Sequence, residues 1–280
     1  MADNASAAAT GPGGLIMRMV PPAFLGRGRA RRLVERNIMV YRRGWVVIVS
    51  GFFEPFFYLL SIGVGIGKLV GQVTLPGGSV LSYPMFVAPG LLASSAMNGA
   101  IYDSTLNIYF KLKFAKTYDA ILATPVGVGD VALGEITWAL IRGLLYSTAF
   151  LVVMAVLGDI ASPWAILALP AAVLIGFAFA AAGMAATTFM RSWNDFDFVQ
   201  LAILPLFLFS TTFYPLSVYP RWLQIVVECT PLYHGVALTR ALCTGVGVGP
   251  GLLVHALYLA VMGAVGLVVS ARRLEILLLR

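Results

Sequence analysis

Six runs of apolar residues, most of them long enough to cross a lipid bilayer as helices, dominate this sequence. They occupy about residues 45–67, 83–109, 131–157, 163–190, 198–213 and 251–271. A helix crosses the hydrocarbon core with about 20 apolar residues. Only 11% of the 280 residues are charged, whereas soluble domains carry roughly 25% charged residues. The pattern predicts an all-α membrane protein with six transmembrane helices, in a single domain over residues 44–280.

An arginine-rich stretch precedes the first run. Over residues 29–43, apolar side chains recur at helical spacing and arginines fill the positions between them. This pattern predicts an amphipathic interfacial helix on the cytoplasmic leaflet. Nucleic-acid binding, which a net charge of +7 otherwise suggests, is discounted because a span follows directly. Residues 1–28, rich in Ala and Gly, are expected to form a flexible cytoplasmic tail.

The 19 lysines and arginines are unevenly distributed between the loops. Most lie before residue 44, after the second run, and near the C-terminus. Because cytoplasmic loops are enriched in Lys and Arg, both termini are expected in the cytoplasm. The sequence therefore predicts a multi-pass protein of the plasma (inner) membrane.

The segment between the fifth and sixth runs differs from the others. Residues 214–249 are moderately apolar but are broken by Pro215, Pro220 and Pro231. Neither half is long enough to cross a bilayer. We expect a re-entrant helical hairpin that enters the membrane from the extracellular side and returns. A structured loop is the alternative.

Four ionisable residues lie within or near the runs: Glu54, Asp103, Glu135 and Arg142. Each costs about 2.5–3.5 kcal/mol at the centre of a membrane helix, so such residues usually face the protein interior and pair. Glu135 and Arg142 lie two turns apart on one helix face. Glu135 is also close enough to the cytoplasmic boundary to be solvated. Structural pairing or gating is favoured over a proton relay.

No catalytic, nucleotide or metal site can be assembled from this sequence. The glycine-rich run that ends at Lys68 lacks the Gly and the Ser or Thr of a phosphate-binding loop, since Ile62 and Leu69 stand there. His234 and His255 have no surrounding nucleophile or ligand set. Cys229 and Cys243 are expected to be unpaired; a disulfide in an oxidising compartment is the alternative.

A mixed segment, residues 118–125, follows the lysines after the second run. Ile121 and Leu122 are large apolar residues, which a loop exposed to water has no reason to contain. They suit a short helix that docks into a partner's groove. Packing on the protein's own inner surface is the alternative.

These patterns resemble the permease subunits of type-2 ABC transporters. The closest branch contains lipo-oligosaccharide (nodulation-factor) exporters and daunorubicin-type drug exporters. Three segments carry the resemblance: Tyr41-Arg42-Arg43 leading into Glu54-Pro55 and the glycines of 63–67; Pro89-Gly90 followed by 116–125 and Gly134-Glu135; and the broken segment with Pro231-Leu232. The middle segment is the most specific.

The resemblance implies an ATP-driven exporter of a lipidic, glycolipid or drug-like amphiphile. The chain would pair with a second copy or a related permease, and two cytoplasmic ABC ATPase subunits would hold the ATP and Mg. It would therefore be no enzyme itself, and would bind no cofactor. A membrane-embedded lipid-modifying transferase and an ion-coupled secondary transporter are the alternatives.

The resemblance also implies three groups of functional residues. The residues implied to couple the chain to the ATPase are Lys116, Tyr118, Asp119, Ile121, Leu122, Thr124, Pro125 and Glu135. The interfacial helix carries Arg32, Arg36, Arg42 and Arg43. The residues implied for the translocation path or outer gate are Glu54, Asp103, Phe207, Phe213, Trp222, Glu228 and His234. The outer gate includes a hairpin over about residues 222–243.

Overall fold

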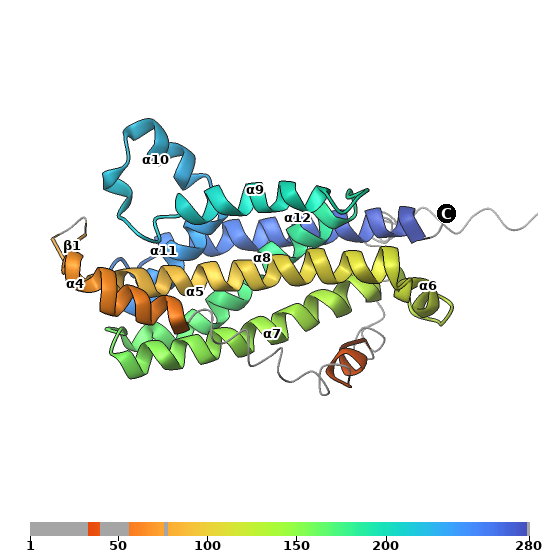
Figure 1. Cartoon of the computed structure of the whole chain (residues 1–280), viewed down its shortest axis with the longest axis horizontal. Coiled ribbons are helices and arrows are strands. Elements are labelled where there is room, and N and C mark those ends of the chain that lie inside the picture. Colours follow the sequence, from red (N-terminus) through yellow and green to blue (C-terminus); the bar gives the residue numbers. More distant parts are fainter. Residues whose placement is uncertain (1–32, 40–55, 76–77, 279–280) are drawn as a thin grey trace, which may run out of the picture.

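A computed structural model of the chain describes residues 33–39, 56–75 and 78–278. These residues form an elongated bundle of helices that run side by side (Figure 1). The predicted helical class is confirmed. The tail over 1–28, Arg32, Arg42, Arg43 and Glu54 lie outside the described residues, as do residues 45–55 of the first expected span.

The helices follow one another along the chain with short connections. Residues 33–39 and 56–61 are helical. The labelled helices are η2 (Ile62–Ile66), α4 (Gly67–Val70), α5 (Tyr83–Tyr102), η3 (Asp103–Asn107), η4 (Phe110–Phe114), α6 (Thr117–Leu122), α7 (Val128–Leu157), η5 (Pro163–Leu167), α8 (Ala168–Thr187), α9 (Asp195–Leu208), η6 (Leu216–Val218), α10 (Arg221–Glu228), α11 (Pro231–Thr244) and α12 (Gly251–Leu278).

Prolines and glycines mark several of the helix boundaries. Pro163 and Pro231 stand in the first turn of η5 and α11, where a missing backbone N–H costs no hydrogen bond. Gly158 and Gly245 end α7 and α11 in the left-handed conformation, which glycine adopts without strain.

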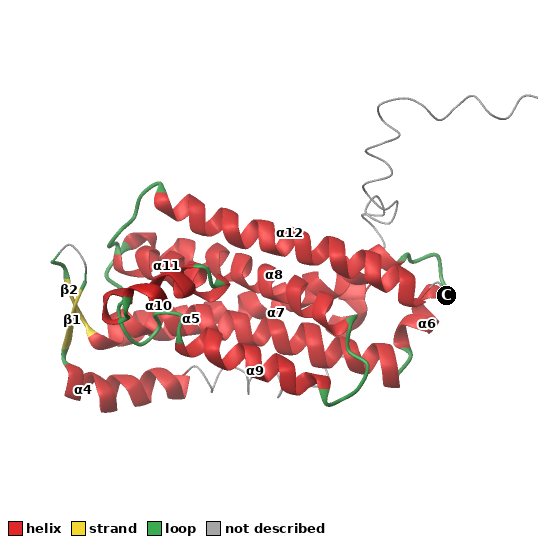
Figure 2. Cartoon of the chain, turned by 90° about the horizontal axis from the view of Figure 1, so that it is seen from above, coloured by secondary structure: helices red, strands yellow, loops and turns green. Residues whose placement is uncertain are grey.

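A small antiparallel hairpin, which the sequence did not predict, joins α4 to α5. Strands β1 (Gln72–Thr74) and β2 (Val80–Ser82) pair with Val73 opposite Leu81. Figure 2 shows this hairpin at one end of the bundle, beyond α4. α10 lies at that same end, and α6 and the C-terminus of α12 lie at the opposite end (Figure 1). We call these the α10 end and the α6 end.

Helix α8 forms the centre of the bundle. It packs against α5, α7, α11 and α12, and 56% of its most apolar window is buried. Its buried face consists largely of Ala and Gly, which lets neighbouring helices approach closely. α7 and α12 are far more exposed, with 22% and 17% of the corresponding windows buried. Exposed apolar helices around a small-residue centre are typical of a bundle surrounded by lipid.

Three helices of the described part of the chain are long and apolar enough to cross a membrane. They are Val128–Leu157, Pro163–Thr187 and Gly251–Leu278. α7 begins at Val128 rather than at 131, and α12 continues to Leu278 rather than ending at 271. α9, at 14 residues, is short for a bilayer. The count of six spans therefore stays a prediction.

Candidate functional site

The α6 end gathers most of the residues assigned to coupling. Lys116 adopts a left-handed conformation with φ 44° immediately before α6. Tyr118 then enters the hydrophobic core and is fully buried. Burial, and secondarily the negative charge of Glu135, raise the pKa of the Tyr118 phenol well above its ordinary value. Tyr118 therefore holds α6 on the bundle as a neutral side chain.

Ile121 and Leu122, the expected anchors for a partner, are partly buried against the same core as Tyr118. Their side chains therefore pack largely on the chain's own surface, which was the alternative interpretation of this segment. The side chains that α6 and the following turn leave exposed are polar or small. They are Lys116, Asp119, Ala120, Ala123, Thr124 and Pro125.

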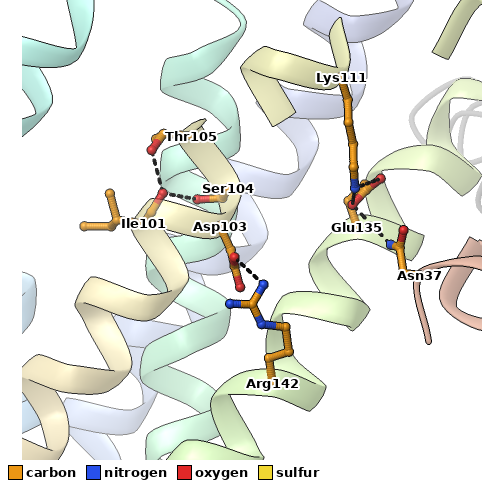
Figure 3. Close-up of polar contacts among 8 residues, drawn as sticks. All are labelled: Asn37, Ile101, Asp103, Ser104, Thr105, Lys111, Glu135 and Arg142. Carbon is orange, nitrogen blue, oxygen red and sulfur yellow. Dashed lines mark hydrogen bonds and ion pairs between the residues drawn. The ribbon is translucent and has the colours of Figure 1, made fainter. Parts of the chain in front are cut away.

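Glu135 is buried and paired rather than solvated. The ammonium Nζ of Lys111 donates to both carboxylate oxygens, at 2.8 Å and 2.7 Å, and the amide of Asn37 donates at 3.4 Å (Figure 3). Lys111 belongs to η4 and Glu135 to α7, so this cluster links the segment before α6 to the helix that follows it. An isolated buried carboxylate would be costly, and the pair removes that cost.

The described part of the expected interfacial helix, residues 33–39, contacts this cluster. Leu33 is buried in the same core as Tyr118, and Asn37 reaches Glu135. Arg36 is half-buried, and its positive charge partly offsets the rise in the Tyr118 pKa. This segment therefore packs against the structure that carries α6.

Asp103 and Arg142 form a second ion pair, deeper in the bundle. The Arg142 Nη1 lies 2.8 Å from the Asp103 Oδ1, and both side chains are mostly buried. Figure 3 shows that the pair joins η3 to α7. Arg142 had been placed on the same helix face as Glu135, but its partner comes from another helix. The expectation that charges inside the bundle pair is confirmed for Asp103, Glu135 and Arg142.

The residues assigned to the path and gate are divided between environments near the α10 end. Phe207 and Phe213 stack edge to face, with ring centroids 5.2 Å apart. Trp222 and Glu228 are exposed on α10. His234 is buried on α11. These residues do not form one continuous cluster with Asp103.

His234 and His255 meet, although the sequence had suggested no setting for either. Their Nδ1 atoms lie 2.7 Å apart, and the His234 ring stacks on Tyr258 at 4.0 Å between centroids. The Tyr258 hydroxyl donates to the Cys229 carbonyl at 2.8 Å. The cluster thus joins α12 to α11 and to the turn before it. Cys229 is exposed and Cys243 is buried, and both thiols are free.

Arg240 is a structural residue that sequence reasoning missed. It lies on α11, and its guanidinium donates to the carbonyl oxygens of Phe86, Thr211 and Thr212 at 3.0, 2.7 and 3.3 Å. It also lies over the Phe86 ring at 3.9 Å. The signal in the sequence was a single arginine within the mostly apolar stretch 235–243.

The structure explains the Pro89-Gly90 motif by close contacts of α5 at these two residues. A side chain at Gly90 would lie 3.0 Å from the Cα of Thr212, and the Thr239 hydroxyl donates to the Pro89 carbonyl at 2.9 Å. Gly90 therefore allows α5 to approach the turn after α9. Together with Arg240, these contacts bind α5, α11 and that turn into one unit.

Comparison with known proteins decides the family. The ABC-2 type transporter family matches residues 29–243 of the chain. The chain belongs to the ABC-2 type transporter family. Nodulation protein J of Rhizobium leguminosarum bv. trifolii is 33% identical over 213 residues, 75% of this chain and 79% of that protein. The homologue of Sinorhizobium fredii (strain NBRC 101917 / NGR234) is 32% identical, covering 74% of this chain and 78% of its own length.

A third protein named nodulation protein J extends the similarity further along the chain. The one from Neorhizobium galegae is 29% identical over 248 residues, which is 86% of this chain and 92% of that protein. The resemblance drawn from the motifs is thereby confirmed. As an ABC-2 permease, the chain is a membrane transport subunit. In the described residues of this permease, no three His, Cys, Asp or Glu side chains lie together as a metal-binding group.

Proposed function

We propose that this permease is the membrane half of an ATP-driven exporter, working with a separate cytoplasmic ABC ATPase that holds ATP and Mg. Two permease chains, identical or related, would enclose the path, with one ATPase subunit docked on each. The cargo would be an amphiphile with a lipidic, glycolipid or drug-like apolar part, taken from the cytoplasm or the inner leaflet.

The construction of α6 is the observation that carries this proposal. The helix is fixed to the bundle by the buried Tyr118 and by the adjoining Lys111–Glu135 pair. The helix and the turn after it present exposed side chains, including Asp119 and Thr124, at the end of the bundle. A rigidly mounted surface of this kind can transmit a displacement of a docked partner to α7, the helix that carries Glu135 and Arg142.

The proposed topology places the α6 end in the cytoplasm, with both termini. This follows from the concentration of Lys and Arg around η4 and α6 and near the C-terminal end of α12. Six spans are proposed. The first covers about 45–67, α5 with η3 makes the second, α7, α8 and α12 are the third, fourth and sixth, and α9 with the turn after it makes the fifth.

The outer gate is proposed to be the α10–α11 hairpin. α11 is buried among α5, α8 and α12, whereas α10 stands away from the bundle (Figure 1). Two consecutive short helices separated at Pro231 support a segment that enters the bundle and returns. Phe207, Phe213, Trp222, Glu228 and His234 are proposed to line or move with this gate.

A charge reversal on the exposed face of α6 tests the coupling assignment. Asp119→Lys is expected to reduce the ABC ATPase that co-purifies with the permease, and to reduce ATP-dependent export in parallel. Asp197→Lys is the matched control, because Asp197 is also an exposed carboxylate at the α6 end, on α9. Equal ATPase recovery and equal export in both variants would remove α6 from the ATPase interface.

Leu122→Asp serves the same purpose less well. Because Leu122 packs partly against the core, its replacement affects folding as well as docking. The exposed Asp119 separates the two effects. Thermal unfolding of Asp119→Lys in detergent should match that of the unaltered chain.

A further inference from the structure

Two apolar grooves lie side by side on the surface of α8. The first, the α8–α12 groove, has a volume of about 710 Å³. The second, the α8–α9 groove, has a volume of about 550 Å³ and reaches η3 and the end of α5. Ala182 and Met262 line both grooves, so the two meet there.

The α8–α9 groove runs between α9 and the centre of the bundle. The main packing contact of α9 is with α11, at the α10 end. Toward the α6 end, Phe189 and Phe198 line the groove instead of packing α9 tightly on α8. Both of these rings are exposed. An apolar molecule that filled the groove would therefore join α9 to α8.

One arginine stands at the α6 end of both grooves. Val265 and Val269 line the α8–α12 groove, and Arg273 follows one turn later on the same face of α12. The Arg273 guanidinium also lies 4.3 Å from the centre of the Phe189 ring, which lines the α8–α9 groove. One cation thus lies where the two grooves end.

Arg273 has no anionic partner in the described part of the chain. Its Nε is buried and makes no hydrogen bond there, and the two described ion pairs join other residues. A buried N–H of a guanidinium without an acceptor is costly. Arg273 as a whole is only partly buried, so an anion from outside the chain can approach the rest of the guanidinium and neutralise its charge.

Asp195, the carboxylate nearest in the groove lining, already has its own donors. Its oxygens accept from the backbone N–H groups of Arg191 and Ser192 at 2.6 Å and 3.2 Å, and from the Ser192 hydroxyl at 3.1 Å. These contacts hold Asp195 at the start of α9. It makes no ion pair with Arg273.

We propose that Arg273 binds the phosphate of a phospholipid whose two acyl chains lie in the two grooves. One phosphodiester with two hydrocarbon chains matches one guanidinium with two converging apolar grooves. In the proposed topology the lipid belongs to the inner leaflet. It is a resident component that connects α8, α9 and α12, distinct from the transported amphiphile. The assignment does not depend on the ATPase or on export.

Lipid retention measured by native mass spectrometry tests the site. The full chain is washed free of lipid in detergent and titrated with phosphatidylglycerol, phosphatidylethanolamine or diacylglycerol. One phospholipid of either kind is expected to bind per chain. Arg273→Gln should weaken that binding about tenfold, the effect of losing one charge-assisted contact. Arg272→Gln, at the exposed neighbouring arginine, should leave it unchanged.

Two further arms identify the parts of the ligand. Diacylglycerol has the chains but no phosphate, and should bind the unaltered chain as weakly as phospholipid binds Arg273→Gln. Ala182→Phe fills the place where the grooves meet and should reduce phospholipid binding with Arg273 intact. If Arg273→Gln does not fold, Arg273→Lys keeps a cation there and should retain most of the binding.

Three results would overturn the proposal. The first is equal phospholipid binding in Arg273→Gln and Arg272→Gln. The second is diacylglycerol binding as tight as that of phospholipid. The third is efficient disulfide formation between two copies of Val265→Cys in lipid bilayers, which would show that a second chain covers the grooves.

Discussion

Lys111 donates from one ammonium group to both carboxylate oxygens of Glu135, at 2.8 Å and 2.7 Å, across the segment that carries α6. The carboxylate is almost completely buried, with 2% of the side chain exposed, whereas Lys111 is 15% exposed. The pair therefore neutralises a charge that the bundle would otherwise enclose.

Removing only the cation should destabilise the fold more than removing both charges. Lys111→Gln leaves Glu135 buried without its cation, which costs roughly 3–5 kcal/mol in comparable buried pairs. Adding Glu135→Gln should restore most of that loss. The measurement is a double-mutant cycle on the free energy of unfolding in detergent. Lys113→Gln, at an exposed lysine of the same helix, is the control and should change little.

The packing of α12 on α8 makes a second prediction. A Cβ added at Gly266 would lie 2.8 Å from the carbonyl carbon of Ala181 and 2.9 Å from the backbone nitrogen of Ala182. Because backbone cannot move aside easily, Gly266→Ala should cost about 1–3 kcal/mol of stability.

Gly99 provides the matched control for that substitution. It lies within α5, and an added Cβ would meet nothing within 4 Å. Gly99→Ala should be neutral or stabilise the fold by up to about 1 kcal/mol, since Ala favours helices. Thermal unfolding in detergent compares the two variants. Equal melting temperatures would contradict the close α8–α12 contact.

The histidine pair predicts a pH dependence of the α11–α12 contact. The Nδ1 atoms of His234 and His255 lie 2.7 Å apart, a contact in which one ring donates a proton and the other ring accepts it. Two protonated rings would repel each other there, whereas both rings can be protonated in the unfolded chain, so stability is expected to fall as pH is lowered from 6.5 toward 4. The facing groups are Tyr233, Tyr258 and the backbone of Glu228.

Amide hydrogen exchange in α11, corrected for the intrinsic effect of pH, measures this contact. Exchange should rise as pH is lowered from 6.5 toward 4. In His234→Gln that pH dependence should be much weaker. Exchange that rises equally in both proteins would mean that another group titrates.

The apolar runs and the prolines predicted most of the helices, because burial in lipid requires long apolar helices and because proline ends them. Pro231, for example, correctly separated two short helices before the last run. The β1–β2 hairpin was missed, since three residues per strand give too short a pattern to detect.

The partners of individual side chains could not be predicted, because they come from helices far apart in the sequence. Arg142 was placed with Glu135 on one helix face, but Asp103 approaches it from η3. His234 and His255 gave no signal alone and meet only when α11 packs on α12. Leu122 is an apolar residue in a mixed segment, which suggested that it docks on a partner. In the structure it packs partly against the chain's own core.

The central claim is that this permease transports with a separate ABC ATPase. The most direct measurement isolates the tagged full-length chain from its native membrane, identifies the proteins bound to it, and assays ATP-dependent uptake of amphiphiles into inverted membrane vesicles. We predict an ABC ATPase in the complex in equal amount with the permease, and uptake that requires hydrolysable ATP. A complex without an ATPase, with uptake driven by an ion gradient alone, would contradict the account.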